Sequence, residues 1–223
     1  MNSTIHRLQR SFKPRFAIIY PFSFFFLFFC GLNPAFLNVG LGLIIAGAFI
    51  RLWANGYAIK NDKLTTSGPY AFVRNPLYLG TFLIAIGFVI ILKSENPALE
   101  RLIGIVFLLG LSFMYYRTIK GEQGMLLAKF NGVYQDYCQH VPAMVPCLVP
   151  YKRGEKWPFS MQRLLKSKEH KPVFWIFILL VIFQLKTRIL IEHKGFNQDS
   201  CFLVIIALIL IILDVLYEIN KKR

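Results

Sequence analysis

The stretch SGPYAFVRNPLYLG, residues 67–80, combines side chains that could hold a charged ligand. Its Gly-Pro and Asn-Pro pairs form turns, and a turn beside a helix N-terminus can present free backbone N–H groups to an anion. Arg74 adds a planar fork of donors that matches a carboxylate. Tyr70 and Tyr78 offer ring faces to an aromatic group or a cation. A plain membrane-interface anchor would use the same residue types, so these residues alone leave both interpretations open.

A second candidate is Glu122, which lies just beyond an apolar run. A carboxylate near a bilayer can hold a cationic or hydroxyl-rich ligand. It can also simply balance a neighbouring cation, Lys120 or Arg117. The histidines and cysteines are scattered without metal-ligand spacing, so we expect no metal site.

The elements that must position these residues are membrane helices. Of the 223 residues, 56% are hydrophobic and only 17% are charged, whereas a soluble domain carries about 25% charged residues. The mean hydropathy is +0.51. Apolar runs of roughly the 17–25 residues needed to cross a bilayer recur along the chain, two of them short. These runs are Phe16–Leu32, Ala35–Trp53, Leu77–Leu92, Leu102–Tyr116, Pro172–Ile191 and Cys201–Tyr217. The sequence therefore predicts an all-α, polytopic integral membrane helix bundle with about six transmembrane helices.

The net charge of +15 is distributed as a topology signal rather than as a nucleic-acid surface. With six spans, the basic clusters of both termini and of two long loops fall on one side, which the positive-inside rule makes cytoplasmic. We therefore expect both termini and the candidate site to face the cytoplasm, with the lipid bilayer as partner and no nucleic acid. We expect a plasma membrane rather than an endoplasmic reticulum, and the sequence indicates no oligomeric state. Lys186 and Arg188 lie on the opposite side, where we expect them to snorkel.

The segment beyond the fourth apolar run predicts a cytoplasmic interfacial helix. Its apolar and aromatic residues recur at the spacings of three and four that mark one helical face. These residues are Leu126, Phe130, Val133, Tyr134 and Tyr137. A helix of this kind lies along the interface rather than across it. The Asn131-Gly132 pair is expected to break it into two helices.

Glycines of the second span superficially resemble a nucleotide-binding loop. Gly40, Gly42 and Gly47 follow no strand, however, and they lie within an apolar helix. We expect small residues such as Gly42, Ala46 and Gly47 to let helices pack closely in lipid.

Taken together, GPYAFVRNPLYLG and the later GEQGMLLAKFNGVYQDYCQHVPAMVP resemble the membrane methyltransferase superfamily. This group holds the isoprenylcysteine carboxyl methyltransferases and the phospholipid N-methyltransferases. The family pattern is Gly-Pro-Tyr, then Arg-His-Pro-x-Tyr-x-Gly opening a helix, then Glu-Glu, then Phe-Gly-x-x-Tyr-x-x-Tyr followed by prolines. The resemblance covers about residues 50–150. It implies a pocket for S-adenosylmethionine that opens to the cytosol, with a lipid-side entrance for the methyl acceptor.

The resemblance carries over to the motif positions of this chain. The cofactor-binding residues that it implies are Gly68, Pro69, Tyr70, Val73, Arg74, Asn75, Tyr78, Leu79, Glu122, Gln123, Tyr134 and Tyr137. The catalytic residues that it implies are Arg74, Asn75, Tyr78 and Glu122. Two positions depart from the pattern, since Asn75 replaces the family's His and Gln123 replaces its second Glu. Both substitutes keep hydrogen-bonding groups, but a titratable group and a negative charge are lost.

These departures favour a carboxylate as methyl acceptor. A protonated amine must lose a proton before it attacks, whereas a carboxylate is already ionised near neutral pH. The resemblance therefore implies a lipophilic substrate of the isoprenylcysteine-carboxylate type. Three alternatives stay open: a methyltransferase for phospholipids or other small lipids, an NADPH-dependent membrane reductase of similar architecture, and a catalytically inactive membrane scaffold.

The expected domain organisation follows from the same pattern. Residues 1–53 form an N-terminal transmembrane hairpin and residues 54–150 the methyltransferase-like catalytic core. Residues 151–223 form a basic cytoplasmic segment and a C-terminal transmembrane hairpin.

Overall fold

The computed structural model describes residues 14–59, 63–167 and 170–222, and these residues form a bundle of long helices. The predicted basic N-terminus, residues 1–13, lies outside the described residues. In chain order the elements are α2 (Pro14–Phe29), β1 (Cys30–Leu32), η1 (Pro34–Phe36), α3 (Leu37–Tyr57), η2 (Gly68–Ala71), α4 (Pro76–Ile91), β2 (Leu92–Ser94), α5 (Pro97–His140), α6 (Met161–Ser167), α7 (His170–Lys186), η3 (Thr187–Ile191) and α8 (Gln198–Lys222). The predicted all-α membrane bundle is confirmed, with one addition. The strands β1 and β2 pair antiparallel, which the sequence did not indicate because each has only 3 residues.

The helices differ in their fit to a bilayer. Within the described residues, 4 helical segments are long and apolar enough to cross a membrane: Pro34–Tyr57, Pro97–His140, Lys171–Ile191 and Gln198–Tyr217. The apolar helix α4 is shorter, with 16 residues. The chain is thus an integral membrane protein, and the count of six spans stays a prediction.

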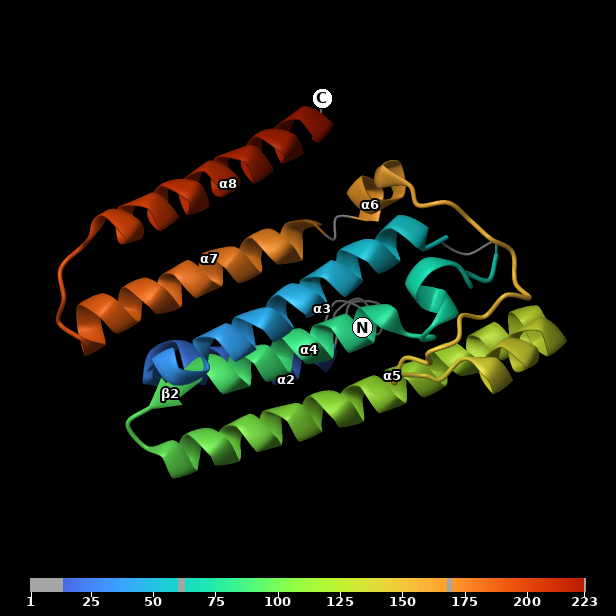
Figure 1. Ribbon diagram of the computed structural model, residues 1–223, viewed down its shortest axis with the longest axis horizontal. Helices are drawn as coiled ribbons and strands as arrows, with labels where there is room; N and C mark the ends of the chain where they lie inside the picture. Colours follow the sequence, from blue (N-terminus) through green and yellow to red (C-terminus); the bar gives the residue numbers. More distant parts are fainter. Residues whose placement is uncertain (1–13, 60–62, 168–169, 223) are drawn as a thin grey trace, which may run out of the picture.

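The arrangement is a layer of roughly parallel and antiparallel rods (Figure 1). In that view α8 lies at one edge, followed by α7, α3, α4 and, at the other edge, α5. A core of buried residues, including Phe26, Ile44, Ile91 and Phe183, joins α2, α3, α4 and α7. The loop after α3 and the far end of α5 meet at one end of the bundle, where the candidate site is found (Figure 1).

The closest helix pair is α3 and α4, and glycines make it possible. A Cβ built on Gly47 would lie 2.4 Å from the carbonyl oxygen of Gly80, and a Cβ on Gly80 would lie 2.6 Å from that of Gly47. Nearer the start of α3, Gly40 and Gly87 face each other in the same way: a Cβ on either glycine would lie 2.7 Å from the carbonyl oxygen of the other. The packing role predicted for Gly47 is therefore confirmed, and Gly40 has the same role. It is wrong for Gly42, whose Cβ would meet nothing within 4 Å.

Lys186 does not snorkel as the sequence predicted, because it caps a neighbouring helix instead. Its Nζ donates hydrogen bonds of 2.8 Å to each of the carbonyl oxygens of Leu27, Phe28 and Cys30. The last carbonyls of a helix have no partner within the helix. Lys186 supplies such partners at the end of α2, which ties α7 to α2.

Replacing Lys186 with Met is expected to lower the stability of the bundle. Met keeps the length of the side chain but leaves three carbonyls without their donor, and a buried polar group that loses its partner costs about 1–3 kcal/mol. The check is the midpoint of thermal unfolding in detergent. Arg188→Met is the matched control, because Arg188 Nε contacts only an exposed loop carbonyl, that of Gly195. Equal losses in the two variants would contradict the capping role.

The long helix α5 is broken where the sequence predicted. Asn131 has φ 41° and ψ −121° and interrupts the helix immediately before Gly132. Beyond the break, Tyr134 and Tyr137 are buried, as expected for the apolar face. Val133 was assigned to that face wrongly, since 63% of its surface is exposed. The rest of the predicted face keeps to one side across the break, since Leu126 and Phe130 line the same cavity as Tyr134 and Tyr137.

Candidate functional site

The turn at residues 67–71 owes its shape to one glycine. Gly68 has φ +60°, a conformation that L side chains rarely adopt, and a Cβ there would lie 2.5 Å from the ring of Tyr57. Pro69 then starts the single 3-10 turn η2. These two residues shape the turn, and neither lines the cavity described below.

Five backbone N–H groups in and after this turn, which the sequence predicted to be free, already donate to carbonyls. Those of Tyr70, Phe72 and Val73 donate within the turn, to Ser67 and Pro69 carbonyls. The N–H of Arg74 donates to the Pro142 carbonyl at 2.9 Å, and the N–H of Asn75 to the Ala143 carbonyl at 3.2 Å. An anion therefore finds no donors on these backbone groups, and the task falls to side chains.

Residues 142–151 form a strap that lies against the turn and holds it. Besides the two bonds just described, the N–H of Cys147 donates to Phe72 O and that of Tyr151 to Ala71 O, both at 2.9 Å. The Asn75 side chain joins in, because its Nδ2 donates to the Ala143 carbonyl at 3.0 Å. The Nδ2 donor of Asn75 is thus used to hold the strap.

A cavity of about 400 Å³ lies between the turn, the loop that follows α3, and the two arms of α5 before and after the break at Asn131. Its lining residues are Ala58, Ile59, Lys63, Leu64, Thr65, Tyr70, Arg74, Asn75, Glu122, Met125, Leu126, Lys129, Phe130, Tyr134 and Tyr137. This volume and mixture of apolar, aromatic and a few charged groups are typical of small-molecule sites.

Arg74 lines the cavity and has a side-chain donor without a partner. Its Nη1 donates to the Cys138 Sγ at 2.7 Å, which fixes the guanidinium against the second arm of α5. Its Nε is buried and has no hydrogen-bond partner among the described residues. A buried donor without a partner is costly, so the guanidinium is suited to receive an anionic group.

Glu122 is held by a neighbour that does not line the cavity. The Tyr78 hydroxyl donates to Glu122 Oε1 at 2.7 Å, and the Tyr78 ring lies 4.8 Å from that of Tyr115. Tyr78 therefore orients the carboxylate from behind. Glu122 and Arg74 line one cavity although they are 48 positions apart in the sequence.

Aromatic residues and a hydrogen-bonded network close the second arm of α5 over the turn. The Tyr137 hydroxyl donates to the Tyr70 carbonyl at 2.5 Å. Outside it, the Tyr151 hydroxyl donates to Asp136 Oδ2 at 2.7 Å, and Arg153 Nη1 to Asp136 Oδ1 at 2.9 Å. Partial burial, followed by the hydrogen bond to Asp136, raises the pKa of Tyr151 to about 12. Tyr151 therefore keeps its proton and remains a donor at neutral pH.

The predicted site residues divide into two groups. Those that line the cavity are Tyr70, Arg74, Asn75, Glu122, Tyr134 and Tyr137. Those that lie outside its lining are Gly68, Pro69, Val73, Tyr78, Leu79 and Gln123. Of the second group, Val73 is buried in the fold with 2% exposed, and Leu79 belongs to the first turn of α4.

Several groups at the cavity could not be predicted from the sequence. Lys63 and Thr65 come from the loop after α3, and nothing in their spacing marks them. Lys63 is already paired, with Glu155 Oε2 at 3.0 Å and the ring of Trp157 at 4.5 Å. Lys129, from the first arm of α5, also lines the cavity. The helical spacing of Leu126 and Phe130 was the one signal that pointed to this wall.

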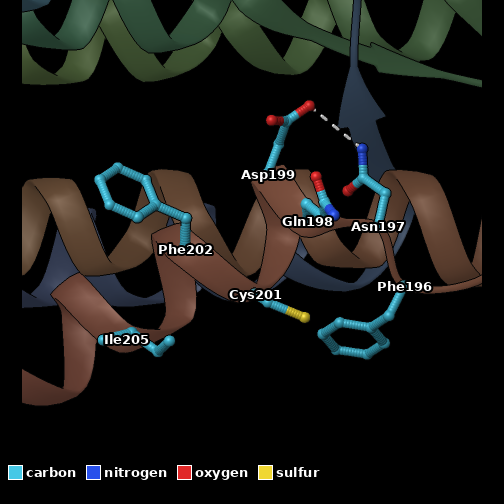
Figure 2. Close-up of a pocket in the computed structure, with 7 residues that line it drawn as sticks. All are labelled: Phe196, Asn197, Gln198, Asp199, Cys201, Phe202 and Ile205. Atoms are coloured by element: carbon cyan, nitrogen blue, oxygen red, sulfur yellow. Dashed lines mark hydrogen bonds between the residues drawn. The ribbon is translucent and has the colours of Figure 1, made fainter.

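A second hollow lies at the opposite end of the bundle, at the start of α8 (Figure 2). The side chains of Asn197 and Asp199 bond to each other there at 3.2 Å (Figure 2). None of the predicted site residues lines it. Across the described part of the chain, no group of 3 or more His, Cys, Asp or Glu is placed to hold a metal ion.

Comparison with known proteins gives matches to the same core. Residues 36–131 match the phospholipid methyltransferase family. The chain is 30% identical over 127 residues to the cobalt-zinc-cadmium resistance protein CzcN of Cupriavidus metallidurans, covering 56% of each chain. It is 33% identical over 91 residues to the protein-S-isoprenylcysteine O-methyltransferase of Schizosaccharomyces pombe, which is 41% of this chain and 36% of that one. The corresponding protein of Tribolium castaneum is 32% identical over 128 residues, 52% of this chain and 43% of that one.

These matches cover only part of this chain and part of each relative. The chain spans about half the length of the first relatives it matches, 56% and 53%. No solved structure matches the chain. The family match begins in η1 and ends at the break in α5, so it contains Arg74 and Glu122 but not Tyr134 or Tyr137. The predicted resemblance is thus confirmed: over its core of α3, α4 and the first arm of α5, this chain is similar to the membrane methyltransferase superfamily that includes phospholipid and isoprenylcysteine methyltransferases.

Proposed function

We propose that this chain is a membrane methyltransferase that uses S-adenosylmethionine to methylate a lipophilic carboxylate. The observation that carries the proposal is one cavity lined both by Arg74, whose buried Nε has no hydrogen-bond partner among the described residues, and by Glu122, whose carboxylate accepts a hydrogen bond from Tyr78. The cofactor carries a carboxylate, an amino group, hydroxyls and an aromatic base, and the cavity offers a partner for each. We also propose that the site faces the cytoplasm, in a plasma membrane.

The residues have distinct roles in this proposal. Arg74 binds the cofactor's carboxylate, and Glu122, oriented by Tyr78, binds its amino group or ribose hydroxyls. The rings of Tyr70, Tyr134 and Tyr137 surround the base and exclude water. Gly68 and Pro69 shape the turn, and Asn75 holds the strap while its amide oxygen stays available as an acceptor. Val73, Leu79 and Gln123 support these groups from outside the cavity lining.

When bound, the cofactor supplies a methyl group for in-line displacement by the acceptor. The protein's part is to position both reactants, which can contribute up to about 7–11 kcal/mol. Lys129 favours an anionic acceptor, because it adds positive charge to the cavity while Lys63 is already paired with Glu155. A carboxylate also needs no general base at neutral pH, which suits a site with Asn75 in place of His.

The alternative with an observation in its favour is an NADPH-dependent reductase. Lys63, Arg74 and Lys129 all line the cavity, and such a set could hold phosphate groups. The ion pair of Lys63 with Glu155 and the presence of Glu122 weigh against it.

Calorimetry with purified protein in detergent tests the proposal. We expect S-adenosylmethionine to bind in the micromolar range and NADPH to bind weakly or not at all. Product formation is then measured by transfer of a labelled methyl group to a prenylated cysteine carboxylate, with phosphatidylethanolamine vesicles as the amine comparison. Binding of NADPH alone would favour the reductase, and binding of neither by folded protein would favour a scaffold.

A further inference from the structure

The strap contains a short loop, residues 143–149, that is fixed at the point where α4 begins. The carbonyl of Ala143 accepts from both the backbone N–H and the side-chain Nδ2 of Asn75, at 3.2 and 3.0 Å. Four residues on, the N–H of Cys147 donates to Phe72 O at 2.9 Å. Asn75 directly precedes the apolar helix α4. The loop is therefore held at the depth at which that helix enters the apolar layer.

Packing within the loop supports the same depth. Met144 packs against a buried cluster that belongs to the apolar parts of α4 and α5 and includes Ala85, Leu111 and Tyr115. On α5 the interface level is marked by cations that lie over aromatic rings. Lys120 Nζ is 4.7 Å from the ring of Tyr116, and the pair is typical of a membrane–water boundary.

The loop exposes aliphatic side chains that nothing in the described structure covers. The exposed fractions are 72% for Val145, 97% for Leu148 and 73% for Val149. Apolar groups clustered on one short loop indicate contact with an apolar partner. Exposed cations follow at once, Lys152 and Lys156. Aliphatic groups flanked by lysines suit the boundary of a bilayer that contains anionic lipid.

We propose that the 143–149 loop inserts Val145, Leu148 and Val149 into the lipid interface, with Lys152 and Lys156 on anionic phosphates of the headgroups. The same loop bonds to the backbone and side chain of Asn75, next to Arg74 at the cavity wall. Contact of the loop's outer face with lipid thus stabilises the cavity wall formed by Arg74 and Asn75, to which the loop's inner face is bonded. A second copy of the chain is the competing occupant, but the lysines and the level of the loop favour lipid.

The test places a tryptophan on the loop of the whole chain in proteoliposomes and measures quenching by phosphatidylcholine brominated on its acyl chains. Leu148→Trp and Val149→Trp are the loop variants, and Gln135→Trp, at an exposed position of α5, is the control. The emission of the three native tryptophans is subtracted using the unsubstituted protein. Because interfacial segments lie about 5–10 Å inside the headgroup–acyl boundary, we expect about twofold or greater quenching at the loop than at the control.

A second arm of the experiment tests the lysines. Adding phosphatidylglycerol to the vesicles is expected to increase the quenching of the loop tryptophan, and Lys152→Gln with Lys156→Gln is expected to remove that increase. Quenching equal to the Gln135→Trp control at both loop positions would overturn the proposal. So would a loop tryptophan that is shielded from both brominated lipid and aqueous acrylamide, because another protein surface would then cover it. Neither readout requires cofactor binding or activity, so the result is independent of the proposed function.

Discussion

Replacement of Arg74 by alanine is expected to weaken S-adenosylmethionine binding by about 10- to 100-fold. A hydrogen bond to a charged group contributes about 1.5–3 kcal/mol, and about 1.4 kcal/mol corresponds to a factor of ten. In the guanidinium of Arg74, Nη1 already donates to Cys138 Sγ, while the buried Nε has no partner among the described residues. The loss is therefore expected in the dissociation constant measured by calorimetry.

Two further variants make this result specific. Arg74→Lys keeps the charge but lacks the planar fork, so we expect an affinity between those of the alanine variant and the unsubstituted protein. Arg117→Ala removes an exposed cation of α5 that does not line the cavity, and its affinity is expected to be unchanged. Unfolding curves of all variants are recorded beside the titrations. Unaltered affinity in a folded Arg74→Ala protein would remove Arg74 from the site.

The second large effect concerns the fold, because Gly47→Ala is expected to separate α3 from α4. The new Cβ would lie 2.4 Å from the Gly80 carbonyl oxygen and 3.1 Å from the backbone nitrogen of Ile84. Backbone atoms cannot move aside as the end of a side chain can, so the helices must shift. Overpacking of this kind typically costs about 1–3 kcal/mol. The measurement is the thermal unfolding midpoint in detergent, which we expect to fall by several degrees.

Gly42→Ala is the matched control on the same helix. Its Cβ would meet nothing within 4 Å, and alanine is favoured over glycine in a helix by about 0.5–1 kcal/mol. We therefore expect this variant to be as stable as the unsubstituted protein or slightly more stable. A fall in stability equal to that of Gly47→Ala would show that the glycine content of α3, rather than close contact with α4, is what matters.

Much of the site could be predicted because its signals are local. Gly68 before Pro69 specifies a turn, and Pro76 starts a helix, whatever the rest of the chain does. The Asn131-Gly132 break was likewise readable from two adjacent residues. Glu122 and Arg74 were identified through motif order, which reflects a shared architecture. Their common cavity could not be derived from either residue's neighbours.

Where the interpretation of the sequence was wrong, a distant segment had changed the outcome. The N–H groups of Arg74 and Asn75 looked free, but the carbonyls of Pro142 and Ala143 take them up. Lys186 looked like a snorkelling residue, but the end of α2 accepts its hydrogen bonds. A backbone donor bonds to whichever acceptor folding brings near it, and local sequence does not contain that information.

The sequence by itself thus determined the apolar helices, the turn at residues 67–71 and the residue types available for chemistry. These follow from hydrophobic periodicity and from the backbone preferences of glycine and proline, which act over a few residues. Only the tertiary structure decided that Arg74 lies against Cys138 and that Lys63 and Lys129 join the cavity. It also decided that Gly47 touches α4 while Gly42 does not. Such contacts depend on the distances and rotations of helices packed against one another, and those are set by the chain as a whole.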